Sequence, residues 1–198
     1  MRDYWQDLEN LTVRHRAKQA LRNLMAAGSD ATPVLRRGLQ HPNAAVRVGC
    51  CVVLDHFLDE ATVPELMANL EHEDEQVRKW ALHALACDTC KEGSCRPAES
   101  EIVPIALRML REDPSRRVRV EAVHLLGTVV TRHPEAVAAL QVAQAADPDP
   151  NVRSVARRYT PGGAIYERLM PTHRVMTKVG PRRPYPRKRR RASLTLTH

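Results

Sequence analysis

The chain has 198 residues, enough for one domain with a buried core and a terminal tail. Only 4% of the residues are aromatic, and Ala, Leu and Val are frequent, which favours helices packed through small and aliphatic side chains. No stretch approaches the roughly 18–20 apolar residues that cross a bilayer, and the start MRDYWQDLEN is polar and acidic, unlike a signal peptide. We therefore expect a cytoplasmic protein whose five cysteines are thiols or metal ligands rather than disulfides.

The formal net charge of +8 is concentrated at one end of the chain. Residues 171–198 contain nine Lys and Arg and no Asp or Glu, which leaves 22 basic and 23 acidic side chains in residues 1–170. The body is therefore nearly neutral, and the asymmetry indicates a polyanionic partner for the tail rather than for the whole chain.

One short pattern recurs along the body: Val-Arg, a small residue four positions after the Val, and Leu eight positions after it. Successive copies are 33, 31, 41 and 34 residues apart. Offsets of 0, 4 and 8 share one helical face, so each copy predicts one buried stripe. The copies are Val13-Arg14-Ala17-Leu21, Val46-Arg47-Cys50-Leu54, Val77-Arg78-Ala81-Leu85, Val118-Arg119-Ala122-Leu126 and a shorter Val152-Arg153-Ala156.

A second helix is predicted ahead of each middle copy. Pro33, Pro64 and Pro104 lie 13, 13 and 14 residues before the Val, and Pro is tolerated in a first helical turn because its missing N–H would be unpaired there anyway. Turn residues separate the two helices of each pair. The residue three positions before the Val is a candidate N-cap in four copies, namely Asn43, Asp74, Ser115 and Asp149.

This unit of helix, Asp/Pro turn and V-R-x-x-A-x-x-x-L resembles the HEAT repeat family over roughly residues 5–160. The resemblance implies an all-α fold, a short right-handed α-solenoid of about five HEAT-like helix pairs in residues 1–160, with a linker at 161–170 and an extended, disordered basic tail at 171–198. In HEAT families the Arg of each copy usually pairs with turn acids between repeats. The alternative is that these arginines form a stripe for nucleic acid.

Three cysteines cluster in an insertion at about residues 87–99, which accounts for the long spacing between the third and fourth copies. Cys87, Cys90 and Cys95 form C-x2-C-x4-C, and two Cys separated by two residues can chelate a tetrahedral ion through a tight turn. The spacing predicts a structural metal site that holds zinc, with an iron–sulfur cluster as the alternative. A redox-active Cys pair and unliganded surface cysteines are the other interpretations.

A closed site needs a fourth ligand. His83 precedes Cys87 by four residues and shares its helical face, so it is the first candidate, while His56 and Glu99 are the alternatives. Two further cysteines, Cys50 and Cys51, lie among aliphatic residues and are interpreted as small core residues.

Two motifs extend the resemblance over nearly the whole chain except the tail. They are C-D-x-C-x4-C, which begins at Cys87, and Tyr159-x-Pro161-Gly162-Gly163-x-x-Tyr166. Together with the repeats they resemble a family of uncharacterised bacterial HEAT-repeat proteins, a resemblance that implies no activity.

Some second-helix residues point away from the buried stripe, at two and six positions after the Val. We expect this face to line the concave surface of the stack and to hold a protein or peptide. The candidate groove residues are Val48, Val52, Val120 and His124. The alternative is that neighbouring helices cover these apolar residues.

The tail segment PRRPYPRKRRRAS has no apolar stripe and cannot bury enough surface to fold alone. Its basic side chains can neutralise phosphates, and its Tyr can stack on an exposed base, which favours RNA or a ribonucleoprotein. A solubilising terminus, acidic protein surfaces and anionic lipid are the alternatives. The predicted contact residues are Arg182, Arg183, Tyr185, Arg187, Lys188, Arg189, Arg190 and Arg191.

The sequence thus favours a non-catalytic HEAT-repeat scaffold or adaptor whose tail binds RNA or a ribonucleoprotein such as the ribosome. The competing hypothesis is a metal- or redox-dependent enzyme, an iron–sulfur protein or a HEAT-type oxidoreductase or lyase, that uses the cysteine cluster.

Overall fold

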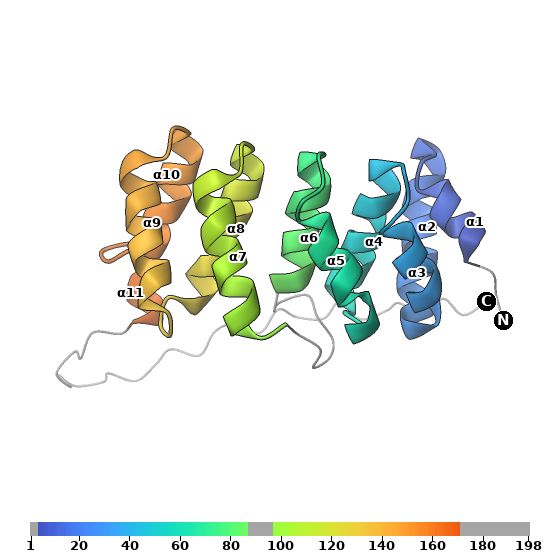
Figure 1. Ribbon diagram of the computed structural model, residues 1–198, viewed down its shortest axis with the longest axis horizontal. Coiled ribbons are helices and arrows are strands. Elements are labelled where there is room, and N and C mark those ends of the chain that lie inside the picture. The colour runs from blue at the N-terminus through green and yellow to red at the C-terminus, as the bar shows by residue number, and fades with distance from the viewer. Residues whose placement is uncertain (1–3, 87–96, 171–198) are drawn as a thin grey trace, which may run out of the picture.

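The computed structural model describes residues 4–86 and 97–170, and every regular element within these ranges is a helix. The longer helices form five consecutive helix–turn–helix pairs (Figure 1). The pairs are α1 Trp5–Asn10 with α2 Arg14–Ala27, α3 Thr32–Gly38 with α4 Ala44–His56, α5 Val63–Asn69 with α6 Glu75–Ala86, α7 Glu99–Glu112 with α8 Arg116–Val129, and α9 Pro134–Ala146 with α10 Pro150–Ala156. The short elements are η1 Gly28–Ala31, η2 Glu60–Thr62, η3 Arg157–Tyr159 and α11 Tyr166–Leu169.

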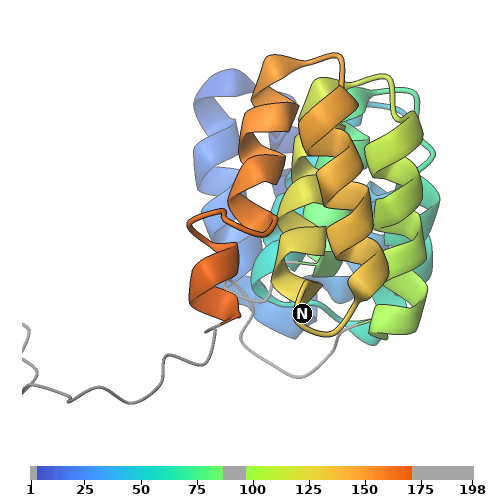
Figure 2. The same cartoon turned by 90° about the vertical axis from the view of Figure 1, so that its left-hand side faces the viewer.

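The pairs stand side by side in one row, and the row is two helices deep. Figure 1 shows the row from α1 to α10, and Figure 2, which views it from one end, shows the two layers. The first helices α3, α5, α7 and α9 form one layer, and the second helices α4, α6, α8 and α10 pack in sequence to form the other. Each pair is covered by its neighbours along the chain, so the fold is the all-α solenoid that the repeats predict.

The predicted stripes and caps are confirmed from the second pair onward. The Val, the small residue and the Leu of these copies are all buried, with at most 2% exposure. Each second helix starts at its predicted N-cap, where the side chain accepts a hydrogen bond from a first-turn backbone N–H. These bonds join Asn43 to Ala45 at 2.9 Å, Asp74 to Gln76 at 2.7 Å, Ser115 to Arg117 at 3.2 Å, and Asp149 to Asn151 at 2.8 Å.

The register predicted for the first copy is wrong. Val13 is itself the N-cap residue of α2, whereas in the other copies the cap lies three residues before the Val. The buried positions therefore move three residues along the helix, to Ala20 at 2% and Leu24 at 0% exposure. Ala17 and Leu21, the residues predicted to be buried, are partly exposed.

The expectation that Pro104 starts a helix is also wrong. α7 begins at Glu99, so Pro104 lies inside a helix of 14 residues, twice the length of α3 or α5. Part of the extra length between the third and fourth copies therefore extends α7. Residues 87–96, which contain Cys87, Cys90 and Cys95, lie outside the described residues, as does the tail from 171 to 198.

Cys50 and Cys51 are core residues, as predicted. Both are fully buried in α4. Burial raises the pKa of the Cys51 thiol to about 12 and that of Cys50 well above its ordinary value, so both stay protonated. Gly38 lies so close to the Cys50 sulfur that an added Cβ would stand 2.4 Å from it, which shows how tightly α3 packs on α4.

Candidate partner-binding surfaces

In the three middle copies, the arginine that follows the Val joins one repeat to the next. Nε and Nη2 of Arg78 donate to the two carboxylate oxygens of Asp113 at 2.8 and 2.9 Å, and Arg119 makes the same bidentate contact with Asp147 at 2.9 and 3.0 Å. Nη1 of each arginine also donates to two carbonyls in the turn of its own pair. These guanidinium groups therefore hold repeats together and do not form a stripe for nucleic acid.

The other arginines of the series show which repeats are joined in this way. Arg47 donates to the side-chain oxygen of Asn69 at 2.8 Å, so an amide replaces the carboxylate in that repeat. Arg153, in the last pair, donates to the carbonyls of Asp147 and Pro148 in its own turn. Arg14 is exposed, because it is the first residue of α2 and lies three positions before the place that corresponds to Arg47 in α4.

A second polar connection crosses three successive second helices. Nδ1 of His83 on α6 lies 2.7 Å from a carboxylate oxygen of Glu121 on α8, and its Nε2 lies 3.5 Å from one of Asp55 on α4. These hydrogen bonds, with Asp55 first, raise the pKa of His83 to about 10. The imidazole is therefore a cation between two carboxylates at neutral pH, and Trp80 contacts its ring edge-on at 5.3 Å between centroids.

This geometry bears on the predicted metal site, whose three cysteines lie outside the described residues. Both ring nitrogens of His83 face carboxylates, so metal ligation would replace one of these contacts. Glu99 binds Arg132 and His133, which hold its pKa down to about 2. His56 is exposed at the end of α4. Within the described part of the chain, no cluster of three or more His, Cys, Asp or Glu has a geometry that could hold a metal ion.

A groove of about 770 Å³ opens on the second-helix layer. It contains two of the four predicted partner residues, Val120 and His124. The other two, Val48 and Val52, lie half-buried on α4, outside this groove. The groove residues come from α6, α8 and α10: Gln76, Lys79, Arg116, Arg117, Val120, Glu121, His124 and Asn151.

The groove rim carries cations whose side chains reach into solvent. Arg116 and Arg117 are 60% and 59% exposed, although Arg116 lies 3.5 Å from Asp149 and Arg117 lies 2.5 Å from Glu75. Exposed ion pairs of this kind contribute little to stability and can exchange partners. The repeat pattern does not predict either arginine, because both precede Val118 in the first turn of α8 and the pattern begins at the Val.

The segment after α10 contacts one groove residue, His124, and packs on α8. The hydroxyl of Tyr159 lies 3.1 Å from Nδ1 of His124, and the Tyr159 ring packs where a Cβ on Gly127 would stand 2.3 Å away. The chain then turns at Gly162, which has a φ of 84°, and Gly163 approaches the backbone of η3 too closely for a side chain. Residues 161–170, expected to be a linker, thus include a tight turn and the short helix α11.

These features define a helical-repeat solenoid with solvent-accessible grooves between its pairs. Residues 6–86 match the sequence profile of HEAT repeats, and the same helix pairs continue to residue 156. Residues 6–86 are therefore HEAT repeats, as the sequence pattern predicts, and α7 to α10 continue the same helix-pair arrangement. A search of curated proteins gave no significant match. No helix in the described ranges is long and apolar enough to cross a membrane.

Proposed function

We propose that this HEAT-repeat protein is a non-catalytic scaffold that binds a polar segment of a partner protein in the groove between α6, α8 and α10. HEAT repeats suggest a protein-binding role. The observation that carries the proposal is the open groove of about 770 Å³, because a cleft spanning three repeats can hold a segment longer than one pair could.

The residues of the groove indicate what kind of segment it binds. Val120 is the apolar side chain of the groove lining, while Lys79, Arg116 and Arg117 supply three cationic groups. A carboxylate on the partner can replace Asp149 or Glu75 as the acceptor for an exposed guanidinium. The bound segment is therefore acidic, with an aliphatic residue that contacts Val120.

Removing the rim cations tests this assignment. The double variant Arg116→Ala/Arg117→Ala should lose the partner that wild-type protein captures from cells. Its matched control is Arg36→Ala/Arg108→Ala, which removes two exposed arginines that pair with Glu65 and Glu71 on the first-helix layer. The control should keep the partner. Equal capture by both variants would overturn the groove assignment, provided that circular dichroism shows both to be folded.

We also propose that the basic tail contacts RNA or a ribonucleoprotein. The observation in favour is the charge distribution, with nine Lys and Arg and no acid in residues 171–198 beside a nearly neutral body. Such contacts are mainly to phosphates, so affinity should fall steeply as salt rises, with little sequence preference. Tyr185 would add stacking on a base.

Deleting residues 171–198 separates the two proposals. The truncated protein should keep its helical content and its protein partner, and it should lose most RNA and ribosome binding when measured at two salt concentrations. If full-length and truncated protein bind RNA equally, the tail has no part in RNA binding.

A further inference from the structure

The second helix of the first pair, α2, carries an exposed row of positive charge. Arg14, Lys18 and Arg22 follow one another at intervals of four residues, so they lie on one face of the helix, about 6 Å apart along its axis. All three are exposed, and so are His15 and Arg16 beside them. α2 contains no Asp or Glu. Arg14, Lys18 and Arg22 are called the cationic row.

The charges of the cationic row are not neutralised within the described part of the chain. Exposed arginines elsewhere face carboxylates, as Arg36 does with Glu65 and Arg117 does with Glu75. No described acidic side chain forms an ion pair with a cation of the row. The helix itself gains nothing from these charges, because like charges four residues apart repel and a cation in the first turn, such as Arg14, opposes the helix dipole. An external polyanion removes this repulsion.

The cationic row lies on the same layer as the groove between α6, α8 and α10, the second-helix groove. Lys18 lies five residues after the N-cap residue of α2, which is the place that Val48 has in α4 and Val120 has in α8. The row therefore occupies the outward face of the second-helix layer. α2 is the end helix of this layer and packs on α1 and α4, so solvent reaches the row (Figure 1).

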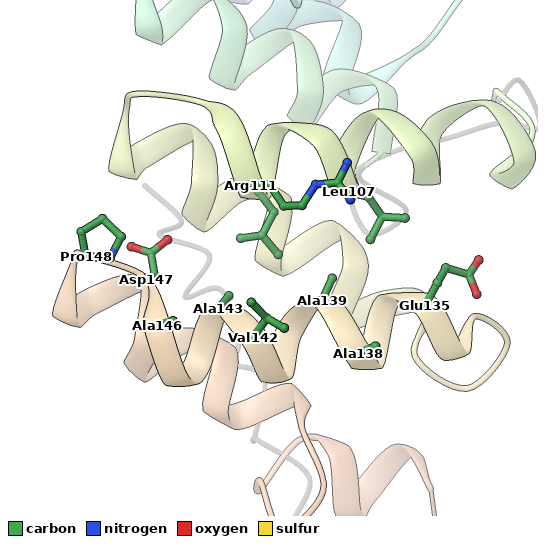
Figure 3. Close-up of a pocket in the computed structure, with 11 residues that line it drawn as sticks. Leu107, Arg111, Glu135, Ala138, Ala139, Val142, Ala143, Ala146, Asp147 and Pro148 are labelled. Atoms are coloured by element: carbon green, nitrogen blue, oxygen red, sulfur yellow. The ribbon is translucent and has the colours of Figure 1, made fainter.

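The first-helix layer has a different character. Its groove between α7 and α9 has a volume of about 460 Å³ and is lined mostly by small and aliphatic side chains, such as Leu107 and Val142 (Figure 3). Arg111 extends over this groove beside Leu107, but it lies 3.8 Å from a carboxylate oxygen of Glu112. A polyanion therefore finds its row of unpaired cations on the second-helix layer.

We infer that the cationic row binds the phosphate backbone of RNA, as a second contact beside the basic tail; the choice of RNA rests on the function proposed above. Arginine and lysine side chains neutralise phosphates and release counterions. The interval of about 6 Å within the row is comparable with that between successive phosphates of one strand. His15 and Gln19, exposed next to the row, supply hydrogen bonds to sugar hydroxyls or phosphate oxygens.

The surroundings of the row favour RNA over other polyanions. A protein partner usually covers an apolar or aromatic centre, and an amphipathic helix that binds a membrane inserts large apolar side chains. α2 exposes no large apolar side chain, because Leu24 is fully buried and Leu21 and Met25 are partly buried. Contact through phosphates needs no apolar centre, so this face suits nucleic acid.

Neutralising the row in the full chain tests the inference. The variant Arg14→Gln/Lys18→Gln/Arg22→Gln keeps good helix formers and removes repulsion, so its melting temperature should equal or exceed that of wild type. Its affinity for a labelled single-stranded RNA, measured by fluorescence anisotropy, should fall roughly tenfold at low salt. The slope of log affinity against log salt should decrease by up to about 2, because each lost phosphate contact contributes about 0.7.

The matched control is Arg36→Gln/Arg108→Gln/Arg111→Gln, which removes the same formal charge from exposed arginines of the first-helix layer. It should keep the RNA affinity and the salt slope of wild type. Equal losses in the two variants would overturn the inference, because net charge alone would explain them. It would also be overturned if the α2 variant bound RNA like wild type, or if the row bound polyglutamate or phosphatidylserine vesicles more tightly than RNA.

Deleting residues 171–198 in the same assay separates this inference from the proposed role of the tail. The deletion and the α2 variant should each lower the RNA affinity. If the α2 variant alone lowers it, the row binds RNA and the proposal for the tail fails. If the deletion alone lowers it, the tail binds RNA and the inference for the row fails.

Discussion

Replacing Arg119 by Ala should destabilise the C-terminal end of the stack far more than an ordinary surface substitution. The side chains of Arg119 and Asp147 are only 10% and 5% exposed, and two bonds of 2.9 and 3.0 Å join them. Removing the guanidinium leaves a buried carboxylate without its counterion, which costs about 3–5 kcal/mol in comparable sites. Two turn carbonyls that accept bonds from Nη1 lose a donor at the same time.

A matched control uses an arginine with the same kind of partner in a different environment. Arg108 on α7 contacts Glu71, which follows α5 in the preceding repeat, but the two side chains are 43% and 65% exposed. Arg108→Ala should therefore change the free energy of unfolding by less than about 1 kcal/mol. The double variant Arg119→Ala/Asp147→Ala should be less destabilised than Arg119→Ala alone, because it leaves no buried charge.

Urea denaturation followed by circular dichroism measures these differences. Because repeat stacks can open one unit at a time, hydrogen exchange should place the loss in α8, α9 and α10. The reasoning would be refuted if Arg119→Ala and Arg108→Ala lost equal stability, or if the loss of protection in Arg119→Ala spread evenly over the stack.

Three further predictions follow from the described contacts and the cysteine spacing. The pKa of His83 is raised from 6.5 to about 10 in the folded protein. Its contacts with Asp55 and Glu121 therefore contribute fully to stability below about pH 6.5, and this contribution is lost as the pH rises through 10. The difference in unfolding free energy between wild type and His83→Gln should shrink over that range, and a constant difference would contradict the ion-pair geometry. Ala122→Asp should prevent stable folding, because the position is fully buried between repeats, and a soluble variant with unchanged melting would refute the register of α8. Cys90→Ser should release about one equivalent of metal if the cysteines hold zinc. A wild-type protein that is colourless, contains no metal and has freely reactive thiols would exclude the site. A brown wild-type protein that absorbs visible light would favour an iron–sulfur cluster.

Much of the architecture could be predicted because the same pattern of buried and capping residues recurs along the sequence. The buried stripe and its cap recur at fixed offsets, so Asn43 predicts where α4 begins and which of its residues are buried. The first repeat breaks this rule because Val13 caps α2 instead of entering it, and Arg16 occupies the position that Val46 has in α4. Local sequence cannot reveal that shift, since V-R-x-x-A-x-x-x-L is present either way.

The functional surfaces were harder to predict because they depend on spacing between repeats. Val120 and His124 could be placed on an outward face from helical periodicity alone. Whether a groove opens beside them depends on how α6, α8 and α10 pack against one another. His83 shows the same limit: its spacing to Cys87 suggests a metal ligand, while Asp55 and Glu121 reach it only through the stacking of repeats.

The most direct test of the scaffold function is site-specific photo-cross-linking in cells. A photoreactive residue in place of His124, which lines the second-helix groove, should capture one defined protein, and the same protein should be captured from Asn151 across the groove. The control position is Ala68, which is exposed on α5 in the first-helix layer and should not capture that protein. Capture of the same protein from Ala68, or of no protein from either groove position, would contradict the account.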